Sequence, residues 1–272
     1  MSHFFETKHI LWHYEIHGSG SKLLLAFHGF NRSASDFHSF ARNLDGIYTI
    51  VAIDLLFHGK SRLKSQIRGS LPTLLDTDLL ELQQHFLNSF GVQKCTLMGY
   101  SFGGRVAMRI TELNGKSVDM LCLIASDALK WNPGYAFAAR TMLGRSLFLL
   151  MARFPASIFA LMNFMGKVGL FHPKAVDFYK NQITNEQVRY RVYNVWVAHR
   201  RLVPDIRKVA RQVVAHNITL RLFFGSYDKI IPAEMGSKLS SLSQPFASVH
   251  ILEAGHRVFE KSQEISTILL NA

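Results

Sequence analysis

The chain has 272 residues, of which 48% are apolar, and this length permits one or two globular domains with a substantial core. Its formal net charge is +12. Charge alone would allow nucleic acid as a partner, but no basic-aromatic motif supports that class, and we expect none. We find no internal repeat, low-complexity tract or long linker. Residues 1–8 lack an apolar signal region, so we expect a cytoplasmic protein.

Strand-type apolar runs alternate with helical patterns along the chain. The later runs are continuously apolar, as parallel strands covered on both faces should be. Such alternation predicts an α/β fold with a mostly parallel central sheet flanked by helices, and catalytic loops at the carboxyl ends of the strands. The predicted strands are Ile10–Ile16, Leu23–Phe27, Tyr48–Ile53, Cys95–Met98, Met120–Ala125, Thr219–Phe224 and Ser248–Leu252, and the predicted helices include Thr73–Phe90, Phe102–Thr111 and Lys261–Leu270.

The two cysteines, Cys95 and Cys122, both fall in predicted core strands. We expect them to behave as small buried hydrophobic residues and not as a disulfide, in keeping with a reduced compartment. The sequence shows no metal-ligand spacing and no phosphate-binding glycine loop. We therefore expect no metal and no cofactor.

The segment Gly99-Tyr100-Ser101-Phe102-Gly103 matches the pattern G-x-S-x-G. A strand precedes it and a helix follows it, so Ser101 should lie on a strained corner with its hydroxyl exposed. Side chains at Gly99 and Gly103 would collide across so tight a turn. Ser101 is therefore the predicted nucleophile, and the chemistry then needs a base, an acid and an oxyanion hole.

The base and the acid are predicted from residues that follow later strands. His256 comes after the strand Ser248–Leu252 and is the predicted base. Asp228 comes after Thr219–Phe224 and is the predicted acid. The alternative acid is Asp127, which follows the strand Met120–Ala125. The order nucleophile, acid, histidine differs from that of the two large serine-protease folds.

These motifs resemble the α/β-hydrolase fold superfamily, in its esterase- and lipase-like serine hydrolases, along almost the whole chain. The resemblance implies an oxyanion hole formed by the backbone N–H groups of Phe102 and Phe30, and a structural role for His28. The segment from Asp54 to Ser61 resembles the D-x-x-G-H-G-x-S turn of the family. Phe57 stands where that turn usually has glycine, which puts the local turn geometry in question.

The resemblance also implies a helical cap, inserted between the strands at 120–125 and 219–224. We expect residues 1–127 and 216–272 to form the hydrolase core and residues 128–215 to form the cap. The insertion contains 14 Lys and Arg against 3 Asp and Glu, so it carries +11 of the net charge of +12. Its Phe- and Met-rich segments at 146–152 and 158–165 fit helices packed on the core, a roof for an apolar acyl group, or a surface that docks on anionic lipid.

Arg105 lies one helical turn after Ser101 and should lean toward the site, where it could bind a substrate carboxylate. The segment from Tyr100 to Arg105 resembles the elbow of the menaquinone-pathway 2-succinyl-6-hydroxy-2,4-cyclohexadiene-1-carboxylate synthases. This resemblance implies that Tyr100 and Arg105 bind substrate. The alternative for Arg105 is an ion pair with a nearby carboxylate.

The sequence thus predicts a serine hydrolase that cleaves an ester or thioester of an apolar acyl or alcohol group, and a small apolar or amphiphilic molecule as its substrate. One alternative is a lyase that acts on a small anionic substrate with the same triad. Another is a non-catalytic member of the fold that binds a ligand or docks on a membrane.

Overall fold

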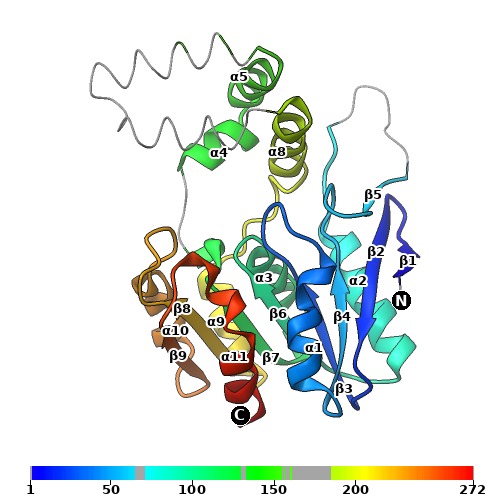
Figure 1. The fold of residues 1–272 in the computed structure, drawn as a ribbon, viewed down its shortest axis with the longest axis vertical. Helices are drawn as coiled ribbons and strands as arrows, with labels where there is room; N and C mark the ends of the chain where they lie inside the picture. The colour runs from blue at the N-terminus through cyan, green and yellow to red at the C-terminus, as the bar shows by residue number, and fades with distance from the viewer. Residues whose placement is uncertain are drawn as a thin grey trace. The chain divides into compact units, whose positions relative to one another are not determined.

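The computed structural model describes residues 2–64, 71–129, 133–154, 156, 160 and 185–271. These residues belong to two compact units. Unit 1 comprises Met1–Gln66, Leu74–Trp131 and Leu202–Ala272, and unit 2 comprises Ile67–Thr73 and Asn132–Arg201. Figure 1 shows the fold with the elements labelled.

Within the described residues, unit 1 contains one nine-stranded sheet in the order β1-β2-β4-β3-β6-β7-β8-β9, with β5 paired to β2. From β4 through β9 along this order, neighbouring strands are parallel, whereas β1, β2 and β5 pair antiparallel. The predicted α/β fold with a mostly parallel sheet is confirmed. The strands are β1 (Ser2–Glu6), β2 (Ile10–His17), β3 (Lys22–Phe27), β4 (Tyr48–Ile53), β5 (Arg62–Leu63), β6 (Cys95–Tyr100), β7 (Val118–Ile124), β8 (Thr219–Gly225) and β9 (Ala247–Leu252).

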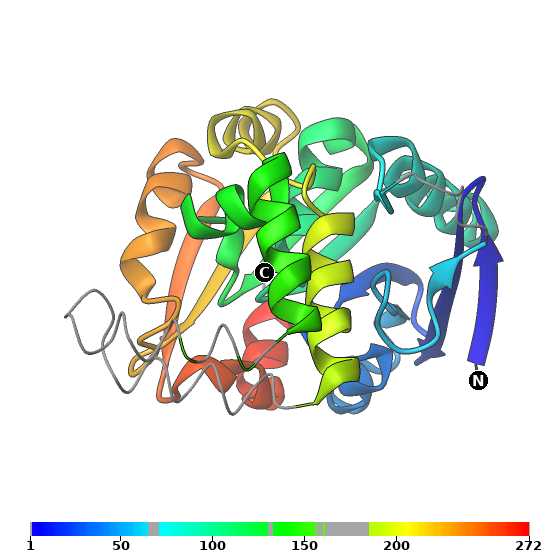
Figure 2. The same ribbon diagram turned by 90° about the horizontal axis from the view of Figure 1, so that it is seen from above.

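Helices cover both faces of this sheet, as Figure 2 shows from above. On one face α1 (His38–Leu44) packs against α11 (Ser262–Leu270). On the other face α3 (Gly103–Asn114) packs between α2 (Asp76–Phe90) and α9 (Ile206–Ala215), and α9 contacts α10 (Ser237–Leu242). Short 3-10 helices complete the unit at η1 (Ala34–Phe37), η2 (Gly115–Ser117), η3 (Asp127–Leu129), η4 (Ala233–Gly236) and η5 (His256–Glu260).

The core of unit 1 lies in the central strands, because helices remove both of their faces from water. Every residue of β4 and of β6 is buried, which agrees with their continuously apolar sequences. Cys95 and Cys122 are free and buried on β6 and β7, as predicted. Burial raises the pKa of the Cys95 thiol to about 12, so this side chain stays a neutral thiol at physiological pH.

Unit 2 contains α4 (Pro133–Arg140), α5 (Met142–Arg153) and α8 (Glu186–Ala198). The Phe148 ring of α5 packs edge-on against Tyr193 and Trp196 of α8, which joins these two helices. The Tyr135 hydroxyl of α4 donates to the carbonyl of His199, 3.1 Å away. The predicted apolar segment at 158–165 lies outside the described residues, apart from a helical position at 160.

The unit boundaries differ from the predicted insertion at 128–215. Residues 202–215, including α9, belong to unit 1 because α9 packs on α3 and α10. The side chain of Asp205 caps the first turn of α9 by accepting from the amides of Arg207 and Lys208. That unit 2 acts as a cap stays a prediction.

The turn between β6 and α3 is held by very close backbone packing. Ser101 has a φ of +48°, a conformation that non-glycine residues rarely adopt. A Cβ on Gly99 would lie 2.6 Å from the Cα of Gly104, and a Cβ on Gly103 would lie 2.1 Å from the carbonyl oxygen of Phe27 at the end of β3. The glycines therefore let α3 begin directly against the ends of β6 and β3, as the pattern predicted.

The space beside Gly104 gives a stability prediction. A Cβ on Gly104 would lie 2.1 Å from the Ser126 Oγ and 2.6 Å from its Cβ, so Gly104→Ala should destabilise the protein by about 1–3 kcal/mol. Ser126→Gly removes those two atoms. The destabilisation of the double variant should therefore be smaller than the sum of the two single destabilisations by about 1 kcal/mol or more. Denaturant titration of all four proteins measures this coupling.

Gly91 provides the control for this comparison of single and double variants. It has a φ of +65° but open space around its Cα, so Gly91→Ala should cost about 1 kcal/mol whatever stands at position 126. Strictly additive effects of Gly104→Ala and Ser126→Gly would contradict the proposed contact.

Candidate active site

Three side chains from separate loops form a hydrogen-bonded chain at the elbow. The Ser101 Oγ lies 3.2 Å from the Nε2 of His256. The Nδ1 of His256 lies 2.8 Å from the Oδ2 of Asp228. The structure thus brings together the three residues predicted as nucleophile, base and acid.

Backbone contacts between the loops after β8 and β9 hold Asp228 beside His256. The amide of Ser226 donates to the carbonyl of Leu252 at 2.8 Å, and that of Tyr227 donates to the carbonyl of Ala254 at 2.9 Å. A Cβ on Gly225 would lie 2.3 Å from the carbonyl oxygen of Gly255, so only glycine permits this approach. Parallel pairing of the two strands therefore extends into the loops that carry the acid and the base.

The Asp228 carboxylate is oriented by its surroundings. Its side chain is fully buried, and its Oδ1 accepts hydrogen bonds from the amides of Ile230 and Ile231 at 2.8 and 2.9 Å. The other oxygen, Oδ2, is thereby directed at His256. Because an ionised carboxylate only accepts, the Nδ1 of His256 carries the proton and the Nε2 is left to face Ser101.

The alternative acid, Asp127, has a different partner. Its Oδ1 accepts from the Nε of Arg105 at 2.8 Å, and Arg105 also lies over the ring of Phe102. Arg105 is largely buried in this pair. The geometry therefore favours Asp228 as the partner of the histidine. Arg105 thus forms the ion pair that was the alternative to substrate binding. Substrate binding by Arg105 stays a prediction.

Phe30 and Phe102, the two predicted oxyanion-hole residues, lie close together. Their rings are 6.4 Å apart and edge-to-face. A Cβ on Gly29 would lie 3.5 Å from the Cβ of Ser101, so the backbone next to Phe30 approaches the nucleophile closely. Phe102 is the N-cap of α3, at the positive end of the helix dipole. Their assignment as oxyanion donors stays a prediction.

His28 holds the loop after β3 in place. It is fully buried, its Nδ1 donates to the carbonyl of Gly29 at 2.7 Å, and its Nε2 accepts from the amide of Leu55 at 2.9 Å. Burial lowers the pKa of His28, which favours this neutral form. Both ring nitrogens therefore tie backbone together, in agreement with the structural role that the resemblance implied.

The turn after β4 keeps a glycine-like conformation at Phe57, whose φ is +66°. It is closed by two backbone hydrogen bonds, from His58 to Leu55 at 2.8 Å and from Ser61 to His58 at 3.1 Å. Phe57 thus adopts a left-handed conformation at a cost of about 1–2 kcal/mol. The departure from glycine that the sequence shows has not opened the turn.

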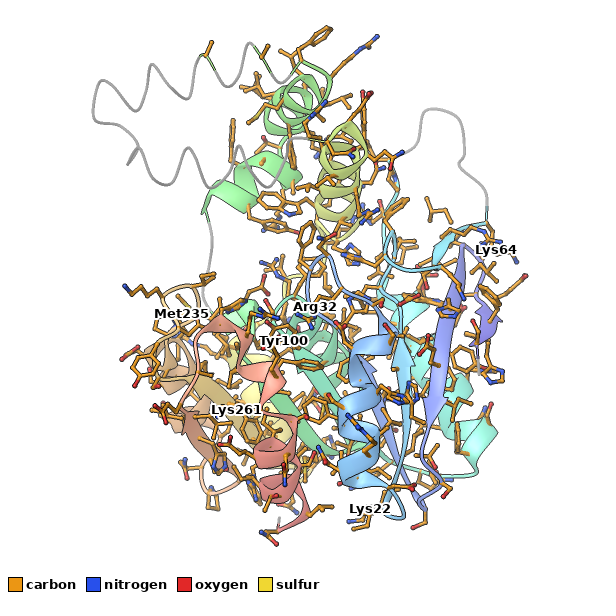
Figure 3. All side chains as sticks on the ribbon, viewed as in Figure 1. Lys22, Arg32, Lys64, Tyr100, Met235 and Lys261 are labelled. Atoms are coloured by element: carbon orange, nitrogen blue, oxygen red, sulfur yellow. The ribbon has the colours of Figure 1, made fainter. Side chains whose placement is uncertain are left out.

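The side chain of Tyr100 is largely buried, and its role in binding substrate stays a prediction. It is 4% exposed, and its hydroxyl donates to the backbone carbonyl of His256 at 3.0 Å. Arg32, which the sequence reasoning missed, lies over the rings of Tyr100 and Phe259. Figure 3 shows Arg32 and Tyr100 side by side at the end of the sheet. No sequence motif marks Arg32, because its position depends on the path of the loop after β3.

The described residues give two further results. They contain no group of three or more His, Cys, Asp or Glu side chains that could hold a metal ion. In the same parts of the chain, every helix is too short or too polar to cross a bilayer.

Comparison with known proteins finds relatives in sequence and a solved structure of similar fold. Epoxide hydrolase 4 of Mus musculus is 26% identical over 67% of this chain, and the match spans 51% of that protein. The uncharacterized hydrolase YugF of Bacillus subtilis is 26% identical over 93% of this chain and 89% of its own length. A thermophilic esterase of Thermogutta terrifontis superposes with a TM-score of 0.67 at 19% identity, covering 100% of this chain and 97% of the esterase.

The family model for the alpha/beta hydrolase fold matches residues 22–263, from β3 to the start of α11. That span contains the elbow and both of the loops that carry Asp228 and His256. The relatives named as hydrolases support a hydrolase role. The chain belongs to the alpha/beta hydrolase fold family.

Proposed function

We propose that the protein is a serine hydrolase that cleaves a carboxylic ester or thioester. The observation that carries this proposal is the continuous chain from the Ser101 Oγ through His256 to Asp228, with separations of 3.2 and 2.8 Å. The rings of Phe30 and Phe102 flank the start of α3 and favour an apolar acyl or alcohol group.

In the proposed reaction His256 takes the Ser101 proton as the Oγ attacks the carbonyl carbon. Asp228 orients the imidazole and stabilises its charged form. The N–H groups of Phe102 and Phe30 would hold the developing oxyanion, which the positive end of α3 also favours. His256 then protonates the leaving group, and water hydrolyses the acyl-enzyme by the same steps in reverse.

The identity of the nucleophile favours an ester over an epoxide. A serine that opened an epoxide would form an ether, which this base and this acid could not hydrolyse. A serine that attacks an ester forms another ester, which water can cleave. The site chemistry therefore supports acyl transfer, although one relative carries the name of an epoxide hydrolase.

Ester hydrolysis by wild type and Ser101→Ala tests the proposal. With p-nitrophenyl esters from acetate to palmitate, wild type should turn over and Ser101→Ala should lose at least about 10³-fold in kcat, because no acyl-enzyme can form. A pre-steady-state burst of p-nitrophenol should accompany turnover. Wild-type activity in Ser101→Ala would contradict the mechanism, and an inactive but folded wild type would favour the lyase or the binding protein.

Matched substitutions at Asp228 and Asp127 test which of the two aspartates is the acid. Asp228→Asn should lower kcat by about 10⁴-fold, because the amide favours the wrong histidine tautomer. Asp127→Asn removes the negative charge that pairs with Arg105 and should leave kcat within about tenfold of wild type. Measuring kcat for both variants with one ester decides between them, and the reverse ranking would make Asp127 the acid.

We further propose that unit 2 docks on an anionic lipid surface. Leu143, Leu147 and Leu150 of α5 and its C-cap Phe154 recur at helical spacing, and their exposed fractions are 64%, 44%, 50% and 51%. Arg140, Arg145 and Arg153 lie in the same segment, which contains no acidic residue. Unit 2 as a whole has 11 Lys and Arg against 2 Asp and Glu, a net charge of +9. An apolar stripe with basic neighbours matches the chemistry of such a surface.

Vesicle sedimentation tests this docking. The protein should bind vesicles of phosphatidylglycerol and phosphatidylcholine more tightly than phosphatidylcholine alone, and rising salt should weaken the binding. Leu143→Glu with Leu150→Glu should reduce the affinity by about tenfold or more. Leu242→Glu, at a leucine of unit 1 that is 45% exposed, should have no effect. Equal binding to neutral vesicles, or equal loss in the control, would refute the proposal.

A further inference from the structure

A second Ser-His-Asp chain lies at the edge of the sheet, outside the site described above. The Ser2 Oγ is 2.5 Å from the Nε2 of His13, and the Nδ1 of His13 is 2.6 Å from the Oδ2 of Asp54. Ser2 stands on β1 and His13 on β2, at the edge of the sheet seen in Figure 1, and Asp54 directly follows β4. We propose that Ser2 is a second nucleophilic serine, which accepts an acyl or phosphoryl group from an activated donor.

The strand register explains how the serine and the histidine meet. Ser2 lies opposite Glu15 and Phe4 lies opposite His13 in the antiparallel pair β1–β2. Ser2 and His13 are therefore diagonal neighbours on one face of the sheet, within reach of one another. The ring of Phe4 lies 5.2 Å from that of His13, which is only 2% exposed.

Asp54 fixes the tautomer of His13, much as Asp228 fixes that of His256. The Asp54 carboxylate is buried and accepts from the amides of Ala34 and Lys60, each at 2.8 Å. Such a carboxylate only accepts, so the Nδ1 of His13 carries the proton and its Nε2 must accept. The Ser2 hydroxyl is then the donor to the Nε2, which is the arrangement of a nucleophile beside a general base.

Lys60 completes a chain in which every hydrogen bond runs in one direction. Its ammonium, which can only donate, lies 3.1 Å from the Ser2 Oγ. The positive charge favours the alkoxide character that Ser2 acquires when His13 takes its proton. Ser2 is exposed, so a donor molecule can reach it.

The chemistry balances without any further reactant. The Ser2 Oγ forms a bond to the carbonyl carbon or phosphorus of the donor, and the bond from that atom to its leaving group breaks. The proton of Ser2 passes to the Nε2 of His13 and then to the leaving group. The product is a protein modified once on β1. A serine without this arrangement would react far more slowly.

The protein contains another serine-histidine contact that serves for comparison. The Ser248 Oγ lies 2.7 Å from the Nε2 of His250, so it also bonds a histidine. Within the described residues no carboxylate is paired with His250, whose ring stacks on Phe223. Ser248 therefore tests what a serine-histidine contact does without the acid.

The experiment uses the Ser101→Ala protein, untagged at its N-terminus, with a fluorophosphonate probe. Intact mass followed by peptide mapping should give one adduct, at Ser2, and at least about tenfold faster than any adduct at Ser248. Adding Ser2→Ala should abolish it, whereas adding Ser248→Ala should leave it unchanged. Labelling of Ser101 in the wild type reports separately on the proposed function.

Two further variants separate an activated serine from an accessible one. His13→Gln should slow labelling of Ser2 by about 10²-fold. Lys60→Met changes an exposed side chain, keeps the fold, and should slow labelling severalfold. No adduct on Ser101→Ala, an adduct at another residue, or an unchanged rate at Ser2 in Lys60→Met would overturn the proposal.

Discussion

The close approach of α3 to the ends of β3 and β6 is the constraint on which the candidate site depends. A Cβ on Gly103 would collide with the backbone of Phe27, and one on Gly99 with that of Gly104, so the helix begins with no side chain between it and the sheet. The same contact forces Ser101 to a φ of +48°. Strain of this kind, about 1–2 kcal/mol, is sustained only because the surrounding packing leaves no alternative. The position of the hydroxyl is thus a product of the core, and the loops need only supply its partners.

In each of the two Ser-His-Asp arrangements, a buried carboxylate that backbone amides hold in place orients the histidine. Asp228 uses one oxygen to accept two amides and directs the other at His256. Asp54 accepts two amides and directs one oxygen at His13. A carboxylate in such surroundings has few acceptor positions left, and a histidine proton fills one of them. Each arrangement is therefore ordered by hydrogen-bond satisfaction as well as by apolar packing, because an unpaired buried carboxylate would be costly.

Sequence patterns located the parts of the fold that burial determines. The central strands are apolar on both faces, and their predicted limits agree with the structure within two residues, as for β4 at Tyr48–Ile53. β1 was missed because its residues alternate between exposed and half-buried, and β5 has only two residues. The choice between Asp228 and Asp127 depended on where two loops meet in space, which periodicity does not encode. Arg32 was missed for the same reason.

Ser101 and Ser2 differ in what surrounds the hydroxyl. These surroundings limit the chemistry that each serine can support. Ser101 stands beside the start of α3, the positive end of the helix dipole, where we propose that backbone N–H groups stabilise an oxyanion. Ser2 lies on a regular strand, where the ladder with β2 occupies the backbone, and only the Lys60 ammonium is at hand. A general base without an oxyanion hole can speed formation of an adduct but does less for its hydrolysis. We therefore expect Ser101 to turn over and Ser2, once modified, to remain so.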